Sequence, residues 1–100
     1  MNYCFDIDGV ICRTNGTNYG AAKPRDSNIA RINALYNKGH HITIFTGRGS
    51  VSGINWRDLT ETQFKKWGLK YHELIFGKPP FDIFIDDKAW NVRDFEEGRI

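Results

Sequence analysis

The stretch Phe5-Asp6-Ile7-Asp8-Gly9-Val10 places two carboxylates two residues apart, where an apolar run gives way to a glycine turn. Side chains two residues apart on an extended chain point to the same side, so Asp6 and Asp8 are expected to project together from the end of a strand. Two like charges held this close repel, and burying either one is costly without a counter-charge. A divalent cation removes that cost, and Mg²⁺ prefers carboxylate oxygens. The alternative is a solvated Asp-Gly turn without chemical function.

Four short apolar runs predict strands at residues 3–7, 41–45, 73–76 and 82–85. The first run is apolar on both faces, which is typical of a central parallel strand, and Cys4 within it is expected to be buried. A helix is expected to start within residues 24–27 and to end near Gly39. A second helix is expected to start at a capping box formed by Thr60 and Gln63, or one turn earlier near Asn55. From residue 88 onward the pattern suggests a short closing helix.

This order of strands and helices predicts an α/β protein with a Rossmann-like parallel sheet of about four to five strands flanked by helices. A chain of 100 residues is long enough for one domain and too short for two, so a single domain over residues 1–100 is expected. Residues 12–25 form a long polar loop, and loops of this length are often functional.

Each predicted strand is followed by polar residues, and in a parallel sheet these strand ends lie along one edge. The residues are, in the order of the strands, Asp6 and Asp8, then Thr46-Gly47-Arg48, then Lys78, then Asp86 and Asp87. Phosphoryl transfer needs a nucleophile, positive charge over the phosphoryl oxygens and donors that hold them, and this set contains all three.

The residue types also indicate which catalytic or binding role each residue has. One aspartate can attack phosphorus and form an aspartyl-phosphate, and a second can protonate the leaving oxygen and later activate water. The Thr46 hydroxyl and the Gly47 N–H are expected to bind phosphate, and Lys78 supplies positive charge. Arg48 is assigned to substrate binding, with a solvated turn residue as the alternative. Asp86 or Asp87 completes an oxygen shell for Mg²⁺.

Four segments, at residues 5–10, 45–48, 77–79 and 85–87, resemble in order the four motifs of the haloacid dehalogenase (HAD) superfamily of phosphatases. The resemblance covers residues 3 to about 90. It implies that Asp6 is the nucleophile, that Asp8 is the general acid and base, and that Thr46 and Lys78 bind phosphate. It also implies Mg²⁺ on the Asp6 carboxylate, the Asp8 carbonyl and Asp86, with Asp87 as a further or more distant ligand.

The stretch from Trp56 to residue 89 is similar to small HAD members associated with capsular polysaccharide biosynthesis, which implies a sugar phosphate or polysaccharide precursor as substrate. The intervals between the motifs are too short for the cap domain that many members insert, so a capless core with an open site is expected. We therefore expect a dimer or tetramer in which a second subunit covers the site, with residues 12–25 at or near the interface. A large substrate that covers the site itself is the alternative.

The sequence leaves other functions open. A nucleotidase or nucleic-acid end phosphatase is the second enzyme reading, but a net charge of only +2 disfavours a nucleic-acid partner. A receiver-like phosphoacceptor would place its acidic pair first and its phosphorylated aspartate on a middle strand, unlike the order here. A catalytically inactive phosphate-binding module is the third alternative. No signal peptide and no apolar run long enough for a membrane span is expected, so the cytoplasm is the predicted location.

Overall fold

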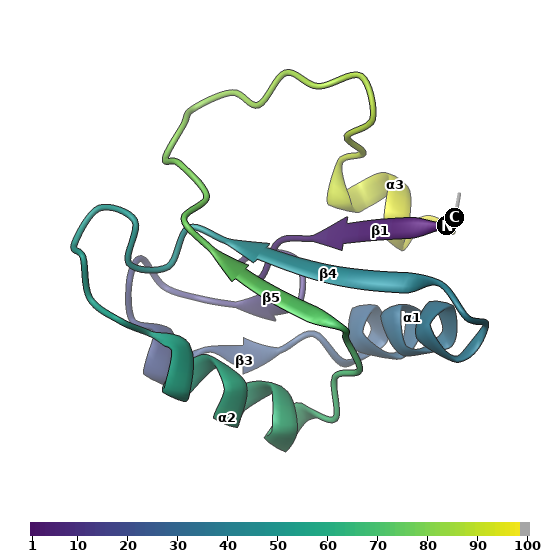
Figure 1. The fold of residues 1–100 in the computed structure, drawn as a ribbon, viewed down its shortest axis with the longest axis horizontal. Coiled ribbons are helices and arrows are strands. Elements are labelled where there is room, and N and C mark those ends of the chain that lie inside the picture. Colours follow the sequence, from purple (N-terminus) through teal and green to yellow (C-terminus); the bar gives the residue numbers. More distant parts are fainter. Residues whose placement is uncertain (99–100) are drawn as a thin grey trace.

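The computed structural model describes residues 1–98, which fold into a three-stranded parallel sheet with two helices packed on one face (Figure 1). The sheet consists of β1 (Asn2–Phe5), β4 (His41–Thr46) and β5 (Glu73–Phe76), in the spatial order β1-β4-β5. An antiparallel ribbon consists of β2 (Cys12–Arg13) and β3 (Lys23–Pro24), with the short 3-10 helix η1 (Tyr19–Ala21) between them. The helices are α1 (Asp26–Asn37), α2 (Arg57–Trp67) and α3 (Val92–Glu96).

The predicted parallel α/β fold is confirmed, and its strand order explains where the core lies. Each crossover moves one strand further in the same direction, and right-handed crossovers of this kind place α1 and α2 on the same face. Along β4 the side chains of Ile42, Ile44 and Thr46 point to that face and are buried, while the alternate residues are half-buried. Ile32 of α1 and Phe64 of α2 pack in the same apolar cluster.

Two expectations about the first strand are wrong, one because of the strand order and one because neither helix covers the opposite face of the sheet. β1 is an edge strand of the three-stranded sheet, paired only with β4, and not a central one. Cys4 is aligned with Thr43 on the face that neither helix covers, so its side chain is exposed although we expected it to be buried. An apolar run on both faces therefore does not by itself identify a central strand.

The predicted strand at residues 82–85 is absent, so the sheet has fewer strands than expected. Ile83 and Ile85 are 78% and 91% exposed. The segment at 77–91 passes outside the sheet from the end of β5 to α3, beyond the edge of β1 (Figure 1). A parallel strand requires a crossover of about a dozen residues or more, and only residues 77–81 separate β5 from the predicted strand at residues 82–85. The connection is therefore too short for the apolar run to become a further parallel strand.

The helix boundaries decide between the alternatives left by the sequence. α2 begins at Arg57, the earlier of the two predicted starts, so Thr60 and Gln63 lie inside the helix and form no cap. Gly68 ends α2 in the left-handed conformation, with φ of 71°. The closing helix forms as α3, and its Phe95 ring contacts the Phe5 ring at 5.2 Å between centroids. None of the helices in residues 1–98 is long and apolar enough to cross a membrane.

Candidate active site

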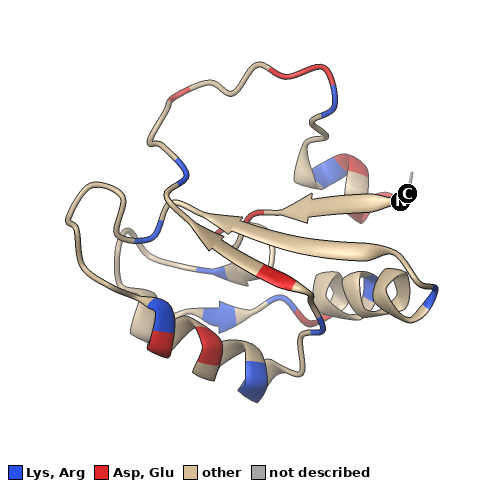
Figure 2. Cartoon of the chain, in the orientation of Figure 1, with Lys and Arg blue, Asp and Glu red and all other residues tan. Residues whose placement is uncertain are grey.

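The carboxyl ends of the three strands bring Asp6 and Lys78 together, as the sequence predicted. Asp6 directly follows β1, and its Oδ2 lies 3.5 Å from Nζ of Lys78. Its Oδ1 accepts a hydrogen bond of 2.8 Å from the Ile7 N–H. The Asp6 side chain is 36% exposed, so one face of the carboxylate remains open to solvent. Figure 2 shows residues of both charges around the carboxyl ends of β1 and β5.

Lys78 is positioned by its main chain. Its N–H donates to the Thr46 carbonyl at 3.1 Å, and its carbonyl accepts from the Ser50 hydroxyl at 2.7 Å. A Cβ atom at residue 47 would lie 3.1 Å from the same Lys78 carbonyl, so Gly47 permits this close approach. The loop after β5 is thus fixed on the loop after β4, which places the ammonium group beside Asp6.

Asp8 lies in a different environment from Asp6. Arg48 donates to it twice, from Nε to Oδ2 at 3.0 Å and from Nη2 to Oδ1 at 2.9 Å, in the forked geometry that suits a guanidinium and a carboxylate. The Thr14 hydroxyl also donates to Oδ1, and the Cys12 thiol lies 3.5 Å from the same atom. Asp8 therefore has a fixed orientation, whereas Asp6 faces a single lysine.

The environment of Asp8 lowers its pKa. Burial acts in the opposite direction and would raise the pKa of this carboxyl group. The hydrogen bonds from Arg48 and Thr14 and the positive charge of Arg48 outweigh burial, so the pKa of Asp8 lies below its ordinary value. Asp8 is therefore ionised in the free protein at neutral pH.

Arg48 is buried, and this changes the role that we assigned to it. The residue is 2% exposed, and its Nη1 donates to Thr60 Oγ1 at 3.0 Å and to Gln63 Oε1 at 2.7 Å. Its guanidinium carbon lies 4.7 Å from the centre of the Tyr19 ring. With Asp8 on one side and α2 on the other, the guanidinium has no surface left for a substrate. We therefore replace the predicted substrate contact with a positioning role toward Asp8.

Sequence reasoning missed the two residues of α2 that hold Arg48. Thr60 and Gln63 fit a capping box, and that interpretation hid their position on the buried face of the helix. A signal was present, because both fall on the stripe that continues with Phe64 and Trp67, and buried polar groups need partners. Gln63 also donates from Nε2 to the Tyr19 carbonyl at 2.6 Å, which ties α2 to the first long loop.

Thr46, predicted to bind phosphate, lies at the end of β4 beside these groups. Its side chain points to the helix-covered face and is 1% exposed. Its Oγ1 accepts a hydrogen bond of 3.1 Å from the Arg48 N–H, which stabilises the turn after the strand. The hydroxyl hydrogen is not needed for that bond, so a donor role toward phosphate stays a prediction.

The turn that carries the two aspartates is held by side chains at the start of α1 and by Glu96 of α3. Arg25 donates from Nη1 to the Gly9 carbonyl at 2.8 Å, and Asn28 donates to the Val10 carbonyl at 2.8 Å. Both side chains also bind the Glu96 carboxylate. Arg25 therefore supports the turn that carries Asp6 and Asp8.

Asp86 and Asp87 do not lie with the other predicted site residues. Both are exposed in the segment 77–91, and Asp86 Oδ1 accepts a hydrogen bond of 2.7 Å from the Lys88 N–H. Within residues 1–98 no three histidine, cysteine or acidic side chains form a group that could hold a metal ion. Asp6 and the Asp8 main chain offer hard oxygen donors, but the predicted magnesium ligands do not converge in this conformation.

The fold is similar to those of solved structures. A crystal structure of a target protein from Vibrio cholerae matches with a TM-score of 0.85 and 24% identity, over 94% of this chain and 85% of that chain. A chain in the structure of a Pnkp1/Rnl/Hen1 complex matches with a TM-score of 0.62 and 17% identity, over 97% of this chain and 34% of that chain. No protein-family model and no curated protein matches the chain. Likeness at these identities supports the α/β fold alone and does not identify an activity.

Proposed function

We propose that this chain is a Mg²⁺-dependent phosphatase of the HAD type that hydrolyses phosphomonoesters through an aspartyl-phosphate on Asp6. The substrate class that we favour is a sugar phosphate or polysaccharide precursor, and the cytoplasm is the location that we propose. Both cysteines are free thiols, which fits a reducing compartment.

The observation that carries the proposal is the difference in environment between two neighbouring carboxylates. Asp6 is open on one face and lies 3.5 Å from the Lys78 ammonium, whereas Asp8 is held by Arg48 and Thr14. Carboxylates that share a site but differ in environment are the pattern expected when one is the nucleophile and the other transfers protons.

The chemistry then follows from these two groups. An Asp6 oxygen attacks phosphorus, the bond to the leaving oxygen breaks, and the proton on Asp8 passes to that oxygen. Asp8 next takes a proton from water, which attacks the aspartyl-phosphate and releases inorganic phosphate and free Asp6. Because Asp8 is ionised in the free protein, it has to take up a proton from water before the first step. The negative charge of an arriving phosphate raises the pKa of Asp8 and favours this step.

Magnesium belongs to the proposal because the phosphoryl oxygens need more positive charge than Lys78 alone supplies. The Asp6 carboxylate and the Asp8 carbonyl are the donors already at the strand ends, and Asp86 or Asp87 would have to move to join them. When bound, Mg²⁺ would neutralise charge on the phosphoryl oxygens.

The test is phosphate release from a panel of sugar phosphates, nucleotides and an activated aryl phosphate, with Mg²⁺ or with excess chelator. We expect turnover only with Mg²⁺. Asp6→Asn should abolish it, because an amide cannot form the aspartyl-phosphate. Asp8→Asn should slow it by about 10²–10⁴-fold on sugar phosphates, and less on the aryl phosphate, whose leaving group needs no proton.

Asp58→Asn is the matched control, since Asp58 is an exposed aspartate in the first turn of α2 and is not one of the predicted site residues. It should retain activity on every substrate. Full turnover in excess chelator would contradict the metal requirement. Equal loss in the Asp6 and Asp8 variants on the aryl phosphate would contradict the division of roles.

A further inference from the structure

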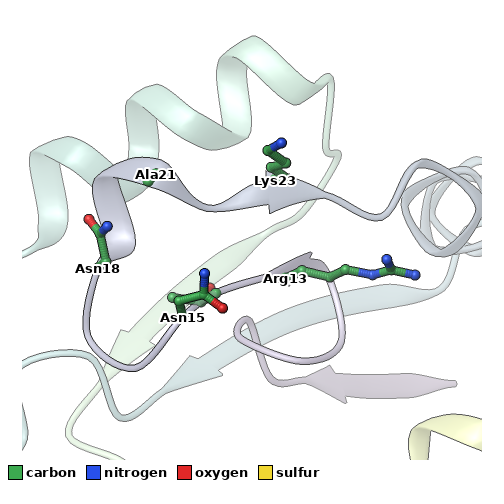
Figure 3. A pocket seen from close by; sticks show the side chains of 6 residues that line it. Arg13, Asn15, Asn18, Ala21 and Lys23 are labelled. Carbon is green, nitrogen blue, oxygen red and sulfur yellow. The ribbon is translucent and has the colours of Figure 1, made fainter.

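A surface pocket of about 260 Å³ lies between the β2–β3 ribbon and the loop that joins its strands (Figure 3). It forms because residues 14–22 leave β2, pass through η1 and return to β3. Figure 3 shows Asn15 and Asn18 at one end of the pocket, and Arg13 and Lys23 extending from the paired strands. The lining residues are Arg13, Thr14, Asn15, Asn18, Ala21 and Lys23. The lining contains two cations and no carboxylate.

Within residues 1–98, four of the five polar side chains that line this pocket lack protein partners, and Thr14 is the exception. Arg13 and Lys23 are directly opposite one another in the ribbon, and like charges in that position are unfavourable. Across residues 1–98 neither cation makes an ion pair, and the Asn15 and Asn18 side-chain amides make no hydrogen bond. A ligand with negative charge and acceptor oxygens would relieve the repulsion and use the free donors.

One residue, Thr14, joins the pocket to Asp8, the proposed proton donor. Thr14 lines it, and the hydroxyl of the same residue donates to Oδ1 of Asp8. In the proposed reaction Asp8 protonates the leaving oxygen, so the leaving group has to lie on the Asp8 side of the phosphoryl group. The part of the substrate beyond that oxygen is therefore directed toward Thr14 and the pocket.

We propose that this pocket binds a second anionic group, a phosphate or a carboxylate, on the leaving-group part of the substrate. The inference rests on the proposed function for the direction in which the leaving group extends. It narrows the substrate class to phosphomonoesters with a further negative charge, such as sugar bisphosphates or phosphorylated sugar acids. Arg13 and Lys23 are exposed, so their ends can turn toward the anion without disturbing the core.

The kinetic test compares a neutral sugar monophosphate, a sugar bisphosphate, a phosphorylated sugar acid and an aryl phosphate. We expect the two doubly anionic sugars to be preferred, and the better of them to identify the group as phosphate or carboxylate. Lys23→Ala and Arg13→Ala should each lower kcat/KM on that substrate about five- to tenfold through KM, as expected for a partly screened charge-assisted contact. Both variants should leave the aryl phosphate unaffected, and Lys66→Ala, on the exposed face of α2, is the matched control.

A binding experiment separates failure of the pocket from failure of the proposed function. Pyrophosphate is titrated without Mg²⁺ into the labelled protein, and the side-chain amide signals of Asn15 and Asn18 are followed by NMR. Saturable shifts that disappear in Lys23→Glu but persist in Lys66→Glu support the pocket, even if no substrate is hydrolysed. The absence of saturable shifts, or equal loss on all substrates including the aryl phosphate, would overturn the proposal.

Discussion

At the scale of single residues, Arg48 gives Asp8 a different environment from that of Asp6, although the two aspartates lie only two positions apart. A lysine there would supply charge but no forked donor set, and it could not bind Asp8 and α2 at once. The guanidinium binds Asp8 through two nitrogens and Thr60 and Gln63 through the third. Asp8 is thereby kept apart from the open, lysine-facing environment of Asp6.

The first prediction concerns this ion pair and pH. Arg48→Met should lower the free energy of unfolding at pH 7 by about 3 kcal/mol, the lower end of the range for breaking a buried pair, because Asp8 is partly exposed. The pKa of Asp8 is lowered in the folded protein, so its stabilising contribution is complete above its ordinary pKa of about 3.9. That contribution is lost as the pH falls through the lowered value.

Urea unfolding between acidic and neutral pH measures this effect. The stability gap between the wild type and Arg48→Met should narrow as the pH falls below about 4, the ordinary range of a carboxyl group. Asp8→Asn is the control background, in which Arg48→Met should cost less because the charge partner is already gone. If the difference in free energy of unfolding between the wild type and Arg48→Met is the same at every pH, Arg48 stabilises the fold only through its packing.

The sequence predicts which residues follow the strands, but it does not predict contacts that depend on how a helix is rotated. Asp6, Asp8 and Lys78 follow parallel strands, and the geometry of a parallel sheet brings such ends together whatever the details. Arg48 was predicted at the site but with the wrong partner. Its contacts with Thr60 and Gln63 depend on how α2 is rotated, and short-range pattern does not specify that rotation. The interpretation of these two residues as a cap made the error harder to see.

At the scale of elements, the segment 77–91 is the part that the sequence described least well. Its apolar residues have the composition of a strand, but strand formation depends on a partner and on a connection that can reach it. The segment is fixed at both ends, by Lys78 at the site and by α3 where Phe95 packs on Phe5. Between these ends it is exposed. An element with few buried contacts is the one most easily rearranged by a ligand.

The second prediction is that Mg²⁺ with a phosphate analogue orders this segment. Asp86 is eight residues from Lys78, and a chain of that length spans up to roughly 26–29 Å when extended, so the carboxylate can reach Asp6 by folding back. Amide hydrogen exchange over residues 80–90 should slow when Mg²⁺ and the analogue bind. Asp86→Asn should abolish both this protection and turnover.

Asp82→Asn is the matched control for that experiment, since Asp82 is an exposed aspartate of the same segment. It should keep both the protection and the activity. Exchange that is unaffected by Mg²⁺, in a protein whose turnover still requires the metal, would exclude Asp86 as a ligand and leave the shell to Asp6 and the Asp8 carbonyl.

At the scale of the whole molecule, the distribution of exposed apolar residues bears on how the chain assembles. The predicted interface at residues 12–25 is mostly polar, and Tyr19 within it is already packed against Trp56 at 5.0 Å between ring centroids. Larger exposed apolar side chains gather elsewhere, in the segment 77–91 and on the open face of the sheet. They are Ile75, Phe81, Ile83, Phe84, Ile85 and Trp90. We take these exposed apolar side chains as the candidate contact surface for a partner.

The last prediction is therefore a homodimer or tetramer that uses this surface and not the first loop. The strand order leaves one face of the sheet without helices. A second copy of the chain would cover the exposed apolar side chains and would also shield the open site from solvent. Light scattering should give a mass above that of the monomer. Ile83→Asp with Ile85→Asp should shift the protein to monomer, because a buried charge without a partner is strongly unfavourable at an interface. Val51→Asp, at an exposed apolar residue in the loop after β4, should not. If the wild type is monomeric at every concentration and still hydrolyses small sugar phosphates, the site needs no second subunit, and the open face has to be explained by another partner.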